Sequence, residues 1–351
     1  MSTASGRETD ALRRALELAA SPGVPLGPNP RVGAVLLAPD GSVVAEGHHR
    51  GAGTAHAEVD ALSRAGESAR GCTAVVTLEP CNHTGRTGPC SRALVAAGVA
   101  RVVFAQVDPN PVAAGGAATL RAAGVEVVGG ADGVGDELAS AAAALNEIWT
   151  FAVTHGRPFV TWKAASTLDG RIAAADGTSR WITSAASRAD VHALRAQVDA
   201  VVVGTGTVLS DDPHLAVRRD GATVTGPQPL RVVVGLRDIP AAARVVDDSA
   251  ETLHLRTRDP AVVLAELRER DVQHVLLEGG PTLAAAFVRA GVVDAVRWYV
   301  APALLGAGRS ALDDAGMSTI SEALRLQVLE VARVGDDVRI DARVLRAMEE
   351  D

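Results

Sequence analysis

Four residues in the first third of the chain have the types and the order that zinc-dependent hydrolysis needs. His56 and Glu58 belong to one short segment, and Cys81 and Cys90 follow in a loop rich in proline and glycine. Two thiolates and one imidazole fill three positions of a tetrahedral Zn²⁺ and leave the fourth to water, as in catalytic zinc sites. The metal makes that water acidic enough to supply hydroxide near neutral pH. The set therefore predicts a catalytic zinc centre.

Glu58 is predicted to be the catalytic proton carrier and not a zinc ligand. It would take the proton of the water and pass it to a ring nitrogen and then to departing ammonia. Nucleobase deaminases combine H-x-E with P-C-x-x-C, whereas eight residues separate Cys81 from Cys90 here. Cys90 directly precedes a helical pattern, and the N-terminal dipole of a helix favours a thiolate.

Other interpretations of these residues stay open. They could be an ordinary surface histidine and idle thiols. A purely structural zinc site would need a fourth protein ligand, for which only Cys72 or His83 is at hand. A nucleoside- or tRNA-editing deaminase fused to an unrelated domain would be favoured by a P-C-x-x-C spacing and a basic face, and both are missing. A zinc-stabilised binding module would keep its function without Glu58.

The elements that must position these residues follow the alternation of an α/β layer sandwich. The first half predicts strands at 32–37, 43–47, 74–78 and 102–105 and helices at 55–65, 91–97 and 138–146. The turn at 39–42, Pro-Asp-Gly-Ser, predicts a hairpin between the first two strands, because Asp and Gly tolerate positive φ. The sheet is therefore expected to be mixed.

The segment His155-Gly156-Arg157-Pro158 breaks the helical pattern before a new apolar strand, and we place a domain boundary there. The second half again predicts strands at 159–165, 200–203, 230–234, 275–277 and 295–300 and helices at 184–196, 260–269 and 281–290. The expected domains are residues 1–150 and 156–351, which fits the length of 351 residues.

Composition limits the classes of function. A formal net charge of −8 without a Lys/Arg-rich run argues against a nucleic-acid partner. The first ten residues are polar, and no apolar run is long enough to cross a bilayer, so neither a signal region nor a membrane association is expected. Three cysteines do not make a disulfide framework and favour metal binding in a reducing compartment. The predicted location is the cytoplasm.

Several motifs, taken in order, closely resemble the bacterial bifunctional riboflavin-biosynthesis deaminase/reductase. The resemblance covers nearly the whole chain. It rests on the segments at 29–35 (NPRVGAV), 53–58 (GTAHAE), 77–90 (TLEPCNHTGRTGPC), 108–111 (DPNP), 163–171 (KAASTLDGR), 179–183 (SRWIT), 207–213 (TVLSDDP) and 278–283 (EGGPTL). Gly88 replaces the usual second proline of the ligand loop, and Gly235-Leu236 stands where the family commonly has a polar residue facing the cofactor.

The resemblance implies a cytidine-deaminase-like three-layer α/β/α domain that binds one Zn²⁺. Its reaction would remove the 2-amino group of a diaminopyrimidinone that carries a ribosylamino 5′-phosphate. Three residues fall on positions that the family uses around the pyrimidine: Asn29, His49 and His83. An amide offers both a donor and an acceptor, which suits the edge of a base.

The second half lacks the G-x-G-x-x-G fingerprint of a dinucleotide-binding domain. Gly204-Thr205-Gly206-Thr207 imitates it weakly. Glu278-Gly279-Gly280-Pro281 is better, because two glycines before a proline-led helix expose backbone N–H groups to a pyrophosphate. These features permit nucleotide binding without establishing it.

By resemblance, this half is a dihydrofolate-reductase-like α/β domain that uses NADPH to reduce the ribosyl group to ribityl. The implied cofactor positions are Ala165, Trp181, Thr207, Asp211, Gly280, Pro281 and Thr282. The implied substrate positions are Ser179, Arg195, Leu215, Arg218 and Glu278. Two arginines can grip a 5′-phosphate bidentately, and Lys163 and Asp169 can support the site electrostatically. The resemblance also implies a homodimer through this domain.

Overall fold

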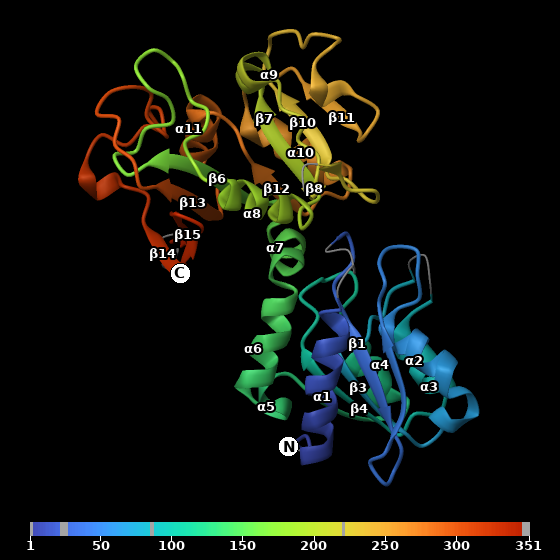
Figure 1. The fold of residues 1–351 in the computed structure, drawn as a ribbon. Coiled ribbons are helices and arrows are strands. Elements are labelled where there is room, and N and C mark those ends of the chain that lie inside the picture. Colours follow the sequence, from blue (N-terminus) through green and yellow to red (C-terminus); the bar gives the residue numbers. More distant parts are fainter. Residues whose placement is uncertain (1–2, 22–26, 85–87, 220–221, 346–351) are drawn as a thin grey trace. The chain divides into compact units, whose positions relative to one another are not determined.

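The computed structural model describes residues 3–21, 27–84, 88–219 and 222–345. The chain divides into two compact units, Met1–Gly156 and Arg157–Asp351 (Figure 1). Residues 85–87 of the expected ligand loop lie outside the described residues. None of the described helices is both long and apolar enough to span a bilayer.

The first unit is built on a five-stranded sheet in the order β2-β1-β3-β4-β5. Its strands are β1 (Gly33–Leu37), β2 (Val43–His48), β3 (Thr73–Leu78), β4 (Arg101–Gln106) and β5 (Glu126–Gly129). Its helices are α1 (Gly6–Ala19), α2 (Ala57–Ala65), α3 (Cys90–Ala96), α4 (Gly116–Ala122), α5 (Ala131–Val134), α6 (Asp136–Leu145) and α7 (Glu147–His155). β1 is antiparallel to β2 and β3, whereas β3, β4 and β5 are parallel. The expected mixed sheet is confirmed.

Two apolar layers sandwich this sheet. One core joins the sheet to α1 and α6, and the other joins its opposite face to α2, α3 and α4. Gly47 explains how α2 comes so close to β2. A Cβ added there would lie 2.4 Å from the carbonyl oxygen of Ala57, so only a glycine lets the first turn of α2 rest on the strand.

The local predictions for this unit differ from the structure mainly at element ends. The hairpin is present, with Gly41 at φ 85°. Helix α2 begins at Ala57 and not at 55, because His56 keeps an extended backbone in front of the helix. The unexpected helix α7 runs past residue 150, and Trp149 and Val153 bury its inner face in the core of the first unit.

The second unit is built on an eight-stranded sheet in the order β11-β10-β7-β12-β6-β13-β15-β14. Its strands are β6 (Phe159–Thr167), β7 (Ala200–Gly204), β10 (Leu230–Val234), β11 (Thr252–Leu255), β12 (His274–Leu277), β13 (Ala295–Ala301), β14 (Leu326–Val334) and β15 (Asp337–Val344), beside the small pair β8 (Arg218–Arg219) and β9 (Ala222–Thr223). Its helices are α8 (Ala185–Arg195), α9 (Thr205–Asp211), α10 (Pro260–Glu269) and α11 (Pro281–Arg289). The six strands from β11 to β13 are parallel.

Helices cover both faces of this sheet. Residues of α10 and α11 bury one face, and Leu194 of α8 and Val208 of α9 pack on the other. Helix α8 begins after Ser184, whose side chain accepts a hydrogen bond from the Ser187 N–H. The antiparallel β14–β15 hairpin at one sheet edge was not among the expected elements. The parallel strands place their carboxyl ends, and the loops that follow them, along one edge.

Candidate functional sites

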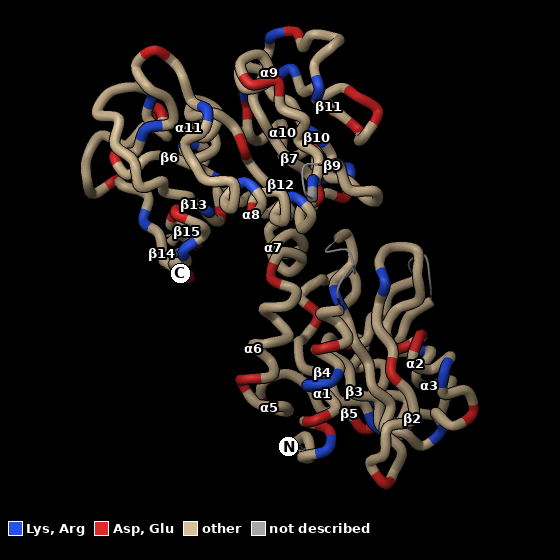
Figure 2. Tube along the Cα trace, in the orientation of Figure 1, with Lys and Arg blue, Asp and Glu red and all other residues tan. Residues whose placement is uncertain are grey.

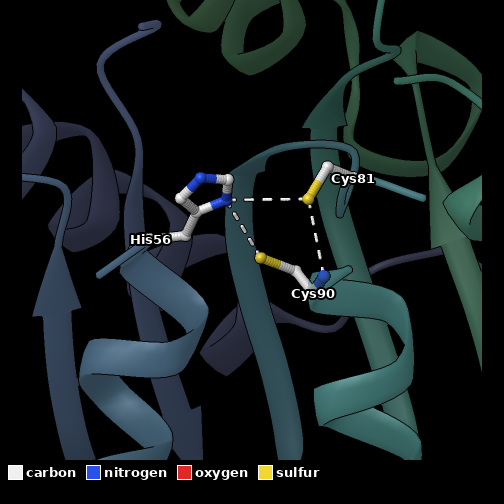
Figure 3. A group of neighbouring side chains, drawn as sticks. All are labelled: His56, Cys81 and Cys90. Atoms are coloured by element: carbon white, nitrogen blue, oxygen red, sulfur yellow. Dashed lines mark hydrogen bonds between the residues drawn. The ribbon is translucent and has the colours of Figure 1, made fainter. Parts of the chain in front are cut away.

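Three side chains of the first unit converge as metal ligands would. His56 Nδ1 lies 3.2 Å from Cys90 Sγ and 3.6 Å from Cys81 Sγ, and the three donor atoms are all within 4.8 Å of one another. Figure 3 shows the imidazole and both sulfurs turned toward a common centre, with His56 and Cys90 at the starts of two helices. One nitrogen and two thiolate sulfurs fit a catalytic Zn²⁺, and the fourth position remains for water.

Electrostatics favour a charged thiolate in this cluster. A hydrogen bond from the Cys90 thiol, followed by others from His56 and the Cys90 N–H, lowers the pKa of Cys81 to about 4. The backbone N–H of Cys90, at the first position of α3, donates to Cys81 Sγ over 3.4 Å. The helix N-terminus therefore stabilises negative charge on Cys81, whereas the sequence predicted this effect for Cys90 itself.

Glu58 lies in the first turn of α2, two residues after His56, and is 4% exposed. Burial raises the pKa of Glu58 to about 7. A carboxyl group that titrates near neutrality can both accept and return a proton at working pH. Its place beside the ligand cluster and its raised pKa suit the predicted role of proton carrier.

A close backbone approach holds the loop that carries Cys81. A Cβ added to Gly116, at the start of α4, would lie 1.7 Å from the carbonyl oxygen of Pro80. Glu79, buried beside it, accepts hydrogen bonds from the N–H groups of Ala117 and Asp108 at 2.9 and 3.3 Å. Strand β3 and helix α4 thus fix the loop from both sides.

Asn29 and His49 lie beside the ligand cluster. The Asn29 amide donates to His49 Nε2 over 3.0 Å, and His49 Nδ1 donates to the Ala55 carbonyl over 2.9 Å. Burial lowers the pKa of His49, which agrees with a neutral imidazole that donates through Nδ1. The His49 ring meets the His56 ring edge to face, with centroids 5.4 Å apart. The structure therefore brings two of the three predicted pyrimidine-binding residues together.

His83 follows Cys81 by two residues in the ligand loop. Its buried Nδ1 has no hydrogen-bond partner within the described part of the chain. An unpaired buried ring nitrogen costs free energy unless a ligand or water meets it. His83 is therefore poised to contact a bound molecule.

The alternative of a structural zinc site does not fit the described residues. Neither Cys72 nor His83 belongs to the cluster of His56, Cys81 and Cys90. The thiol of Cys72 is buried and donates to the carbonyl of Ser68. Three protein ligands are the set that a catalytic site uses, so the open fourth position is retained.

The second unit contains a cavity of about 1070 Å³ at the carboxyl ends of its parallel strands. Six residues predicted from the sequence to bind cofactor or substrate line it: Ser179, Thr207, Asp211, Gly280, Pro281 and Thr282. A Cβ added to Gly280 would lie 3.6 Å from Thr207 Oγ1, so the turns after β7 and β12 face each other closely. Open sheets of this kind bind nucleotides outside the carboxyl ends of their strands.

Two predicted cofactor residues do not line this cavity. Ala165 lies within β6, paired with Tyr299 of β13. Trp181 is 70% exposed, and the Arg188 guanidinium lies 4.3 Å from the centre of its ring. In this structure, therefore, the cavity is formed without these two residues.

An ion cluster centres on Glu278, two residues before Gly280 of the cavity wall. Arg195 Nε and Nη2 donate to the two carboxylate oxygens of Glu278 at 2.6 and 3.0 Å, and Lys163 Nζ lies 3.9 Å from Glu278 Oε2. Burial opposes ionisation of Glu278, but Arg195 and Lys163 outweigh it and lower the pKa of Glu278 to about 2. Burial lowers the pKa of Lys163, although Glu278 partly offsets the effect.

This pairing bears on the predicted role of Arg195, which stays a prediction. The sequence predicted that Arg195 would hold a phosphate bidentately, but the structure gives both donors of that edge to Glu278. The remaining nitrogen, Nη1, donates to the carbonyl of Ala216 over 3.3 Å. Arg195 is thus arranged to orient Glu278.

Arg218 and Leu215 lie near this cluster. Buried Arg218 Nε has no hydrogen-bond partner among the described residues, which leaves a donor for an anion. Arg195 and Arg218 both lower the pKa of His192, after burial, so the two guanidiniums face a common region. Leu215 is buried with φ at 58°, a strained conformation of the kind that is found at functional sites.

Sequence reasoning missed two basic residues of the cavity wall. Arg237 and Arg258 each come three residues after the end of a parallel strand, β10 and β11 respectively. The strand β10 was predicted at 230–234, so a basic residue just beyond its carboxyl end was an available signal for Arg237, whereas β11 was not predicted and Arg258 had no such signal. With these arginines, the glycine turns and the proline-led helix, the cavity fits a phosphorylated dinucleotide.

Comparisons with known proteins agree with this description. Residues 6–106 match the cytidine and deoxycytidylate deaminase zinc-binding region, and residues 158–340 match the RibD C-terminal domain. The chain is 51% identical over 311 residues to riboflavin biosynthesis protein RibD of Mycobacterium tuberculosis, which covers 89% of this chain and 90% of the relative. It is 39% identical over 361 residues to RibD of Escherichia coli, at 93% and 96% coverage.

Solved structures match along nearly the whole chain. Acinetobacter baumannii RibD superposes with a TM-score of 0.85 at 38% identity, over 97% of this chain and 99% of that one. A Thermotoga maritima protein described as a diaminohydroxyphosphoribosylaminopyrimidine deaminase/5-amino-6-(5-phosphoribosylamino)uracil reductase superposes with a TM-score of 0.83 at 34% identity and the same coverage. These matches confirm the expected fold class, a deaminase-type α/β/α domain followed by a reductase-type α/β domain.

Proposed function

The chain belongs to the RibD family of riboflavin-biosynthesis proteins, and from this premise we propose which of its residues carry each reaction. It is a bifunctional enzyme with a zinc-dependent deaminase and an NADPH-dependent reductase. We assign deamination to the first unit and reduction to the second. The convergence of His56, Cys81 and Cys90 beside buried Glu58 carries the first assignment.

The substrate follows from the name of the Thermotoga maritima relative. We propose that the first reaction hydrolyses the 2-amino group of 2,5-diamino-6-ribosylamino-4(3H)-pyrimidinone 5′-phosphate and releases ammonia. The second reaction then reduces the ribosyl side chain of the aminouracil product to ribityl. The zinc-dependent deamination therefore precedes the reduction.

In the deaminase, His56, Cys81 and Cys90 hold the metal, and bound Zn²⁺ supplies a water of lowered pKa. Glu58 accepts the proton of that water at its carboxylate and delivers it to the pyrimidine ring and the leaving amine. Asn29 and His49, already hydrogen-bonded to each other, read the edge of the ring. His83 offers its unpaired Nδ1 to the substrate.

In the reductase, NADPH supplies the hydride, and the protein has to align the donor with C1′ of the sugar. Thr207, Asp211 and the Gly280–Thr282 turn form the cofactor wall. Glu278, oriented by Arg195, and Lys163 stand beside that wall and orient the sugar. Arg218 offers its free Nε to the 5′-phosphate.

The proposed function is tested by supplying the diaminopyrimidinone ribosylamine phosphate with and without NADPH, while ammonia and NADPH absorbance are recorded together. We expect ammonia without cofactor and NADPH oxidation only after deamination. NADPH oxidation on the undeaminated substrate would contradict the proposed order. Absence of ammonia would contradict the deaminase assignment.

Removing zinc with a chelator is expected to abolish ammonia release while NADPH-dependent reduction of the deaminated intermediate continues. The three ligands belong to the first unit, whereas the reductase cavity is lined only by residues of the second. Stoichiometric Zn²⁺ should restore ammonia release. Deamination by a metal-free protein, verified by elemental analysis, would exclude the zinc mechanism.

We also propose that the chain forms a homodimer through the β14 edge of the second unit. β14 is an edge strand that exposes a row of apolar side chains: Leu326, Val328, Leu329 and Val331. Exposed apolar edges are unusual in monomers and favour pairing with a second copy.

The expected result for Val331→Asp is a monomer of 35.9 kDa by light scattering, where the natural protein gives twice that mass. Val262 on α10 is also exposed and apolar, so Val262→Asp is the matched control that should leave the dimer intact. A dimer that survives Val331→Asp would place the interface elsewhere.

We place the enzyme in the cytoplasm. Its cysteines are free, and two of them are metal ligands that must stay reduced. This location also supplies the reduced nicotinamide cofactor.

A further inference from the structure

We infer that Arg237 and Arg258 bind the 2′-phosphate of NADPH and thereby make the reductase select NADPH over NADH. The inference rests on the proposed reductase function and adds the residues that distinguish the two cofactors. Both arginines line the cofactor cavity, and both are exposed to it from loops at the carboxyl edge of the sheet.

The strand order determines which end of the cofactor these arginines meet. The sheet runs β11-β10-β7-β12-β6, with Lys163 on β6 and Glu278 directly after β12. Under the proposed function, in which Glu278 and Lys163 orient the sugar, the nicotinamide lies at this end. The pyrophosphate then fits the facing turns after β7 and β12. The adenosine half extends toward β10 and β11, where Arg237 and Arg258 follow the strand ends.

Neighbouring strands are about 4.8 Å apart, so β6 and β11 lie roughly 19 Å from each other across four spacings. An extended molecule of two nucleosides joined by a pyrophosphate can bridge that separation. Figure 2 shows basic segments close to α9 and β11 with acidic segments among them, so the phosphate position is argued from the two arginines of the cavity wall and not from net charge.

Both guanidiniums are available to an anion. Within the described part of the chain, neither Arg237 nor Arg258 has a hydrogen bond or an ion pair, although each has an adjacent aspartate. Asp238 is paired with Arg256, and Asp259 accepts the Ala261 N–H at 2.9 Å as the cap of α10. The carboxylates adjacent to them in sequence are therefore engaged elsewhere, and Asp211 is the acidic residue that lines the same cavity.

The other two arginines of the cavity wall are engaged. Arg289 donates to the carbonyl of Asp314, and Arg309 donates to Thr282 Oγ1 and Asp313 at 3.0 and 3.3 Å. These contacts hold the wall around α11 together. The unpaired positive charge of the cavity is thus concentrated at the β10–β11 end.

The turn after β10 has no side chain at residue 235 that could contact the adenosine ribose. Gly235 has φ at 140°, and a Cβ added to it would lie 2.5 Å from Thr205 Oγ1. No side chain fits at this position, so a polar contact to the adenosine ribose cannot come from residue 235. Arg237, two residues on, places its Nη2 close to Gly206 in the first turn of α9.

The chemistry of the ligand matches two arginines. A 2′-phosphate is a dianion with three acceptor oxygens, whereas NADH has a neutral hydroxyl at that position. Guanidiniums bind phosphate oxygens bidentately through charge-assisted hydrogen bonds. Discrimination therefore comes from attraction to the phosphate and should disappear when the arginines are removed.

The test compares Arg237→Ala, Arg258→Ala and the double variant with the natural protein. For each single variant we expect kcat/KM with NADPH to fall about 10- to 100-fold, through a higher KM and with little change in kcat. Values with NADH and the KM for the deaminated substrate should change little. Calorimetry without turnover should show weakened binding of 2′,5′-ADP, while binding of 5′-AMP is unchanged.

Arg268→Ala, which removes an exposed arginine of α10 outside the cavity, is the matched control and should leave all these values unchanged. Unchanged binding of 2′,5′-ADP in the double variant would overturn the inference, and so would an equal loss with NADPH and NADH. If the natural protein binds 2′,5′-ADP but does not reduce the intermediate, the proposed function fails while the phosphate site stands.

Discussion

Replacing Glu58 by glutamine is expected to slow ammonia release by about 10²- to 10⁴-fold while the protein keeps its zinc. Glutamine preserves the shape of the side chain but cannot accept a proton from water. Glu58 is not one of the three clustered donors, so the metal should remain bound. The measurement is the rate of ammonia release alongside zinc content by elemental analysis.

Two comparisons separate this outcome from general damage. Glu67→Gln changes an exposed carboxylate of the same unit and should leave ammonia release unchanged. Glu58→Gln should also reduce the deaminated intermediate at the natural rate, because the reductase cavity is lined by the second unit. Loss of zinc together with activity would instead make Glu58 a ligand, and an undiminished rate would remove it from the mechanism.

Most of the deaminase site was predictable because its residues lie close together in short sequence segments. His56 and Glu58 share one helix start, and Cys81 and Cys90 share one loop. The residue types alone did not predict the contact between Asn29 and His49, although the predicted hairpin brings their segments together. Gly33 at the start of β1 pairs with His48 at the end of β2, so residues that flank the hairpin at that end must meet.

The reductase site was less predictable because its contacts join distant parts of the chain. Arg195 and Glu278 are 83 positions apart, and neither has a local pattern that distinguishes a buried ion pair from an exposed charge. For that reason the pairing of Arg195 with Glu278 was not foreseeable, and phosphate binding by Arg195 stays a prediction. The alternating strands, in contrast, were foreseeable from their apolar runs, which parallel sheets bury on both faces. The β14–β15 hairpin was missed because exposed charges interrupt its pattern.

Replacing Glu278 by glutamine is expected to destabilise the second unit by about 3–5 kcal/mol at pH 7 and to slow reduction about 10²-fold. The substitution leaves Arg195 and Lys163 as neighbouring buried positive charges without their shared carboxylate. Denaturant unfolding followed by tryptophan fluorescence reports this unit through Trp162 and Trp298, which pack together in its core, once Trp149 in the core of the first unit has been replaced by phenylalanine in both proteins. Ammonia release should be retained under native conditions.

The pH dependence of the stability lost in Glu278→Gln identifies the electrostatic origin of that loss. Glu278 has its pKa lowered from 4.5 to about 2, so the carboxylate contributes stability that is fully present above pH 4.5. That contribution is lost as the pH falls through about 2. The gap in unfolding free energy between the natural protein and Glu278→Gln should therefore be constant from pH 7 to 5 and close toward pH 2.

An exposed ion pair serves as the control for Glu278→Gln. Glu251 is paired with Arg270 at 3.2 Å, with its side chain 69% exposed, so Glu251→Gln should cost less than about 1 kcal/mol at any pH. If Glu278→Gln behaved like this control, the buried carboxylate would not be compensating Arg195 and Lys163. The geometry argues otherwise, because both oxygens of Glu278 meet donors from Arg195, and Lys163 approaches the same carboxylate from β6. We therefore expect the Glu278 carboxylate both to compensate the two buried cations and to maintain the geometry of the neighbouring cavity.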